Sequence, residues 1–185
     1  MNRSLAILVG MAAVLAIEGQ QPGDGPQYTA AGKLIRPADY REWVWLSSGL
    51  GMSYGPLAQT EQDSNPPFDN VFVNPSAYRA FRQSGRWPDK TVLVLEVRGS
   101  VSKGSINQGG HFQGELRGVE IEVKDAGRWT FYGFNGAADS AASIPASASC
   151  YTCHAQHGAV DNTFVQFYPT LLEVAKQKGT LKTNE

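Results

Sequence analysis

The chain has 185 residues, of which 16 are Lys or Arg and 17 are Asp or Glu, so its net charge is −1. This balance lacks the basic character of nucleic-acid-binding proteins, and we expect no nucleic-acid partner. The length suits one domain with a buried core, and the 20 glycines and 10 prolines favour short elements joined by many turns.

Residues 1–19 have the pattern of a secretory signal peptide. Arg3 precedes an apolar run over residues 5–17, and the small residues Ala16 and Gly19 offer cleavage sites. The run is short for a membrane span, although an uncleaved anchor is the alternative. We therefore predict a periplasmic protein without a membrane span after cleavage.

A flexible lead-in rich in Gln, Gly and Pro is expected over residues 20–38, before a single domain over residues 39–185. The domain begins with an aromatic-rich segment at residues 40–46. In it Trp43 and Trp45 are two residues apart, which predicts a strand with both rings on one face.

The next predicted elements are a long loop over residues 49–67, where turn-forming residues dominate, and a short strand at 70–73. A helix should follow. Asn74 suits its N-cap, Pro75 its first helical position, and Gly85 the position just past its end.

Three further strands are predicted downstream. Residues 91–97 form a nearly continuous apolar run, residues 119–124 alternate between apolar and charged side chains, and residues 128–134 are rich in aromatics. The glycine-rich stretch 99–114 should be a mobile loop. A last helix is expected from Pro169 until just before a glycine at position 179.

Residues 150–154 read C-x-x-C-H, the attachment signature of a c-type haem. Each thiol can add across one vinyl group of the porphyrin, and the adjacent imidazole can bind the iron. We predict one covalent haem c per chain, attached through Cys150 and Cys153, with His154 as the metal ligand.

The same residues allow other interpretations. A zinc site would have to combine them with His157, and the four ligands would crowd together without a distant second pair, unlike known zinc spacings. A thioredoxin-like redox pair would follow a strand, whereas residues 137–149 read as a loop. A Cys150–Cys153 disulfide in a haem-free domain stays open, since the chain has only 2 cysteines.

The order of the predicted elements indicates an α+β fold that is mainly antiparallel β. We expect one sheet-rich domain with short helices, in which the haem is held by the C-terminal C-x-x-C-H segment against the sheet.

Besides the haem motif, several segments carry a family resemblance: Asp39-Tyr40-Arg41-Glu42-Trp43-Val44, Val71-Phe72-Val73-Asn74-Pro75 with Tyr78, the segment from Gly85 to Val97, and Phe167-Tyr168-Pro169. The resemblance extends over residues 39–179 and is to the cytochrome P-460 family, which includes the cytochromes c′-beta. It implies a β-rich fold and a five-coordinate haem with proximal His154. The open iron face would bind small gases or nitrogen compounds such as nitric oxide or hydroxylamine. Family members are often homodimers, so a homodimer is one option.

The chain departs from the family at the haem edge. By this resemblance, Leu95 stands where hydroxylamine-oxidising members carry a lysine bonded to the haem, and leucine cannot form that bond. Lys90 would face the other side of the strand, and Lys103 lies in the glycine-rich loop. An arginine in the pocket of some members is replaced by Asp69. Oxidoreductase activity on hydroxylamine or nitric oxide is therefore left open, and an apolar gas-binding pocket gains support.

Glu120 is the candidate catalytic residue. It matches an acidic residue that lies over the haem in some hydroxylamine-oxidising members, where a carboxylate could take protons from the substrate. The alternating pattern alone predicts something simpler: Glu120 shares a polar strand face with Glu122 and Lys124 and meets solvent.

A second functional hypothesis is a mono-haem electron-transfer cytochrome. In that protein Met52 or His111 would close the iron as a sixth ligand, and reaction would be limited to electron exchange with a redox partner protein.

Overall fold

The structure is a computed structural model that describes residues 23–53, 65–136 and 138–182. The predicted signal peptide and most of the predicted long loop lie outside the described residues. In chain order the elements are β1 (Leu34–Ile35), η1 (Tyr40–Glu42), β2 (Val44–Leu50), β3 (Phe68–Val73), α1 (Pro75–Ser84), β4 (Val92–Val101), β5 (Phe112–Asp125), β6 (Arg128–Phe134), β7 (Ser140–Ala141), α2 (Ser149–His157), η3 (Val165–Phe167) and α3 (Pro169–Lys178).

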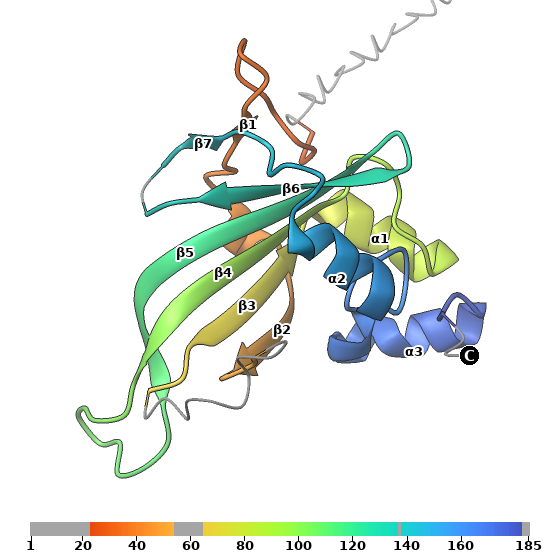
Figure 1. Cartoon of the computed structure of the whole chain (residues 1–185). Helices are drawn as coiled ribbons and strands as arrows, with labels where there is room; N and C mark the ends of the chain where they lie inside the picture. The colour runs from red at the N-terminus through yellow and green to blue at the C-terminus, as the bar shows by residue number, and fades with distance from the viewer. Residues whose placement is uncertain (1–22, 54–64, 137, 183–185) are drawn as a thin grey trace, which may run out of the picture.

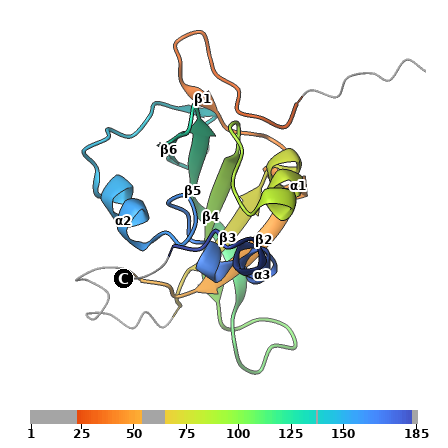
Figure 2. The ribbon, with the colours of Figure 1, turned by 90° about the vertical axis from the view of Figure 1, so that its right-hand side faces the viewer.

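Strands β2 to β6 form one antiparallel sheet in which each strand pairs with its neighbours in sequence (Figure 1). Strands β1 and β7 pair separately as a small two-stranded sheet. The helices α1, α2 and α3 all lie on the same side of the large sheet (Figure 2). The predicted α+β, mainly antiparallel class is confirmed.

Each face of the large sheet is covered by its own hydrophobic core. One core packs the sheet against the segment around β1 and includes Leu34, Tyr40, Val94, Ile121 and Tyr132. The other packs the opposite face against α1 and α3 and includes Val73, Phe81, Leu93, Leu171 and Ala175. We call this second face the helix face. The alternation of side chains along each strand sends neighbouring residues to opposite cores.

The first strand differs from the prediction. Residues Tyr40–Glu42 form a short 3-10 helix, and the strand starts only at Val44. Trp43 is buried before the strand begins, whereas Trp45 lies within it and is 57% exposed. The prediction that both rings share one strand face is therefore wrong. A large apolar side chain can be buried whether its residue lies in a turn or in a strand. A run of such residues therefore does not show which of the two forms.

Helix α1 confirms the predicted boundaries, with Asn74 at the N-cap, Pro75 at the start and Gly85 in the left-handed region at φ 73°. The Asn74 side chain makes no cap hydrogen bond. Its Oδ1 instead accepts a hydrogen bond from the backbone N–H of Val92 (2.8 Å), and its Nδ2 donates to the carbonyl of Lys90 (3.2 Å). Asn74 therefore ties the start of the helix to strand β4.

The strands at 70–73, 91–97, 119–124 and 128–134 are confirmed, but the glycine-rich loop is shorter than predicted. Strand β4 ends at Val101 and strand β5 begins at Phe112, so only the residues between them form the connection. This hairpin projects from the molecule (Figure 1). Glycines are compatible with an extended ladder, and the register shifts between Val97 and Arg98 and between Arg98 and Ser100, where this stretch begins.

The described part of the predicted lead-in contacts the domain. The Asp24 carboxylate accepts hydrogen bonds from the Ser76 backbone N–H (2.6 Å) and hydroxyl (2.5 Å), and Leu34 is fully buried. In the described residues, every helix is too short or too polar to cross a bilayer.

Candidate functional site

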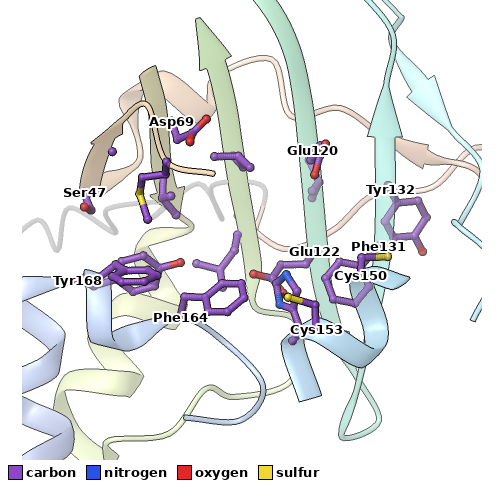
Figure 3. Close-up of a pocket in the computed structure, with 18 of the residues that line it drawn as sticks. Ser47, Asp69, Glu120, Glu122, Phe131, Tyr132, Cys150, Cys153, Phe164 and Tyr168 are labelled. Carbon is purple, nitrogen blue, oxygen red and sulfur yellow. The ribbon is translucent and has the colours of Figure 1, made fainter. Parts of the chain in front are cut away.

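A cavity of about 350 Å³ lies between the helix face of the sheet and the chain segment that carries α2 and η3 (Figure 3). All five candidate site residues predicted from the sequence line it: Leu95, Glu120, Cys150, Cys153 and His154. The structure therefore brings together side chains from two strands and one helix that are far apart in sequence.

The register of the sheet explains how its wall of the cavity is built. Leu95 on β4 and Glu120 on β5 are direct cross-strand partners. The adjacent row on the same face contains Leu93, Glu122 and Phe131. Two residues advance a strand by about 7 Å, so the two rows line the cavity at successive levels.

Helix α2 supplies the opposite wall. Cys150 and Cys153 are three residues apart in this helix and therefore lie on one helical face, toward the cavity. Both are free, partly exposed cysteines. The next residue, His154, has its imidazole between the rings of Phe131 and Phe164, at centroid distances of 4.6 and 4.5 Å.

The His154 ring is held by one well-formed hydrogen bond. Its Nδ1–H donates to the backbone carbonyl of Asn162 at 3.0 Å. Burial lowers the pKa of His154, although the Asn162 carbonyl acts in the opposite direction. A neutral ring that donates from Nδ1 keeps its lone pair on Nε2, the state in which histidine binds metal ions.

Glu122 lies beside this histidine. Its side chain is 12% exposed, and its Oε2 is 3.4 Å from Nδ1 of His154. That oxygen makes no hydrogen bond within the described residues. Burial raises the pKa of Glu122 to about 8, so the carboxyl group is mainly neutral at pH 7.

The solvent-facing position expected for this strand face is therefore wrong for Glu122 and for Lys124, which is only 14% exposed. Glu120 is exposed but lines the cavity. The strand period correctly placed these residues on one face. It could not show that α2 and the loop after it cover that face. Because of this cover Glu122 lies beside His154, and it is a site residue that the sequence did not single out.

Asp69 and Met52 also line the cavity. The pKa of Asp69 is raised to about 6, first by burial and then by the negative charge of Glu120. Of the other residues weighed above, His111 and Lys103 are absent from the described lining, and Lys90 instead pairs with Asp125 at 2.6 Å.

The cytochrome P460 family model matches residues 37–165, about 70% of the chain. The chain belongs to the cytochrome P460 family. No curated protein matches it. The matched region contains every site residue described above, and membership makes the chain a haem-binding cytochrome that acts in redox or nitrogen chemistry.

The cavity of this cytochrome fits a haem by the chemistry of its side chains. Two free thiols share one helical face, an imidazole that donates from Nδ1 follows them, and the facing wall presents the apolar groups of Val71, Leu93 and Leu95. The zinc alternative has no such support. Among the described residues, no three His, Cys, Asp or Glu side chains are grouped to hold a metal ion.

Proposed function

We propose that this cytochrome is a periplasmic protein with one covalently attached haem c, whose open distal iron site binds small nitrogen species, above all nitric oxide. One observation carries the proposal: Cys150, Cys153 and His154 share a single cavity with Leu95 and Glu120. The residues proposed to attach the haem and those proposed for the distal face thus line the same cavity.

Cys150, Cys153 and His154 would hold the haem on its proximal side. The thiols of Cys150 and Cys153 would bond the porphyrin edge, and Nε2 of His154 would bind the iron, with the ring fixed through Asn162. When bound, the haem supplies an iron that takes up small ligands and exchanges electrons.

The distal wall favours uncharged ligands. Leu95 and Val71 present apolar groups that exclude water, and a polar ligand entering such a wall loses hydration without replacement. Leucine offers no amine for a bond to the porphyrin, so we expect little hydroxylamine oxidation. Glu120 and Asp69 could hold a proton on their carboxylate oxygens beside a bound ligand.

Met52 favours a second candidate function. Because this thioether lines the same cavity, it could bind the iron as its sixth ligand. The iron could then exchange electrons but not bind a small ligand. A high-spin resting spectrum that is unchanged in Met52→Ala would reject this function. A low-spin spectrum that Met52→Ala converts to high spin would establish it.

Two measurements test the main proposal. Mass spectrometry of the mature chain should find the mass of one covalent haem, and Cys150→Ser/Cys153→Ser should abolish haem staining on a denaturing gel. Nitric oxide added to the reduced protein should then shift its Soret band. Haem retained by the double variant would refute the attachment residues, and an unresponsive Soret band would refute the open iron site.

The surroundings of the protein are also part of the proposal. Residues 1–19 would direct export and be removed, electrons would pass to or from a redox partner protein, and the chain would form a homodimer. The N-terminal residue of the purified protein tests the first point, and sedimentation equilibrium tests the third.

A further inference from the structure

The carbonyl that holds His154 belongs to a tight turn with an uncommon backbone. Asp161 and Asn162 both have positive φ, at 47° and 61°, and Val160 and Thr163 are bridged on either side. Two central residues with positive φ define a type I′ turn. Side chains other than glycine adopt this region reluctantly, and Asp and Asn tolerate it best. Such a turn persists when its surroundings hold it.

A set of buried and partly buried contacts holds this turn. Lys124 donates from Nζ to the Trp87 carbonyl at 2.8 Å and to Asp161 Oδ2 at 3.2 Å. The Trp87 backbone N–H donates to the same Asp161 oxygen at 3.3 Å. The Trp87 ring Nε1 donates to the Thr163 hydroxyl at 2.8 Å. The turn is thus fixed from both of its ends.

Lys124 is the residue that joins this turn to the sheet. It lies on β5, on the same strand face as Glu122, which is beside His154. Its side chain is 14% exposed, and that of its partner Asp161 is 21% exposed. Arg86 also approaches Asp161, at 3.6 Å, but its side chain is 62% exposed, so that pair is screened by water.

We propose that Lys124 and Asp161 are positioning residues for the haem ligand: they clamp the turn so that the Asn162 carbonyl accepts a hydrogen bond from His154 Nδ1–H. The inference rests on the proposed function, in which His154 binds the iron. An acceptor at Nδ1 fixes the orientation of the ring and makes Nε2 a stronger electron donor, which favours the oxidised iron.

Loss of the clamp has a defined consequence. When the turn relaxes, Nδ1 either loses its acceptor or turns to Glu122 Oε2, 3.4 Å away. Because the Glu122 carboxyl group is mainly neutral, its oxygen is a weaker acceptor than an amide carbonyl, so both changes weaken electron donation to the iron. In either case both the iron–histidine stretching frequency and the midpoint potential leave their wild-type values.

The test uses haem-loaded protein. Lys124→Met removes the amine but keeps the apolar stem, and Asp161→Asn removes the charge from a residue type that still tolerates positive φ. Resonance Raman spectra of the reduced protein give the iron–histidine frequency, and a redox titration gives the midpoint potential. Both variants should shift both quantities. If Lys124→Met does not fold, Asp161→Asn decides alone.

Three controls should keep the wild-type values. Arg86→Gln removes the exposed partner of the same carboxylate. Lys90→Met removes an amine from an exposed pair with Asp125. Asn162→Gly keeps the carbonyl and allows positive φ. A shift in Arg86→Gln equal to that in Lys124→Met, or any shift in Asn162→Gly, would overturn the clamp.

Different results would refute the proposed function and the clamp. A wild-type protein without haem, or without an iron–histidine band, refutes the proposed function and this inference with it. Haem-loaded Lys124→Met and Asp161→Asn proteins that both keep the wild-type frequency and potential overturn the positioning role alone.

Discussion

At the scale of single residues, Leu95 determines which chemistry the cavity wall offers. It is partnered across the sheet with Glu120 and faces the cavity, so this point of the wall combines a branched apolar group with a carboxylate. Neither can form an amine-derived bond to a porphyrin carbon. The lysines considered above lie elsewhere, with Lys90 paired to Asp125.

We therefore predict that the wild-type protein carries no lysine–porphyrin bond and shows an ordinary c-type spectrum. Proteolysis followed by mass spectrometry should recover the peptide of residues 91–98, and those containing Lys90 or Lys103, without haem. Only the peptide with Cys150 and Cys153 should carry it. A haem-modified lysine peptide would contradict the prediction and restore hydroxylamine oxidation as the leading function.

Asp69 should make binding of anions to the distal site depend on pH. Its pKa is raised to about 6, so the group is neutral below that pH and negative above it. We predict that the affinity of the ferric protein for thiocyanate falls several-fold as the pH rises through about 6, because the anion then meets an added negative charge. Binding of uncharged nitric oxide should change little. Spectral titrations at a series of pH values measure both.

Two variants identify the group. Asp69→Asn should remove the pH step. In Glu120→Gln the fall in thiocyanate affinity should remain but occur at a lower pH. Burial is the larger cause of the raised pKa of Asp69, and the charge of Glu120 is the smaller one. A step that survives in Asp69→Asn would assign the titration to another residue.

At the scale of elements, the junction after α2 depends on close packing. A Cβ added to Gly158 would overlap the backbone of Asn162, in the turn that faces His154. We predict that Gly158→Ala lowers the free energy of unfolding by roughly 1–3 kcal/mol, the usual effect of overpacking. Denaturant unfolding measures the loss. Gly118→Ala is the control, since nothing lies within 4 Å of its added Cβ, and an equal loss there would contradict the packing argument.

The elements also show what sequence patterns can and cannot predict. The alternation along β5 predicted a strand and put Val119, Ile121 and Val123 in the core, because the period of two is a local property. The burial of Glu122 was missed, since it depends on a helix that is distant in the chain. The haem motif located one wall of the site. Asn162 was missed too, although Asp161-Asn162 is a typical turn pair, because no pattern shows that its carbonyl faces His154.

At the scale of the whole molecule, a buried carboxylate ties the opposite face of the sheet together. Glu96 on β4 is 3% exposed. Its oxygens accept hydrogen bonds from the hydroxyl of Tyr40 at 2.5 Å and from the Nε atoms of Arg41 and Arg98 at 2.7 and 2.5 Å. Burial raises the pKa of Glu96, but the hydrogen bonds from Arg98, Tyr40 and Arg41 outweigh it and leave the pKa below its usual value.

This network should make the protein sensitive to acid. A carboxylate with a lowered pKa stabilises the fold above its ordinary value of 4.5, and that stability is lost as the pH falls toward the lower folded value. We predict that Glu96→Gln costs roughly 3 kcal/mol at pH 7 and loses less stability than wild type below pH 4.5. Denaturant unfolding at both pH values measures this. Glu115→Gln, at an exposed pair with Arg117, should resemble wild type throughout.

The attachment motif comes late in the chain, after every strand of the large sheet. A polypeptide emerges N-terminus first, so the wall that bears Leu95 and Glu120 can be complete while Cys150 is still waiting to appear. The strands of the large sheet precede α2 along the chain, and α2 adds the groups proposed to anchor the haem. If the proposed haem attachment holds, we expect it to be among the last events in the making of this protein. A chain that stops before this stretch would lack both the C-x-x-C-H motif and α3, which packs against the helix face of the sheet.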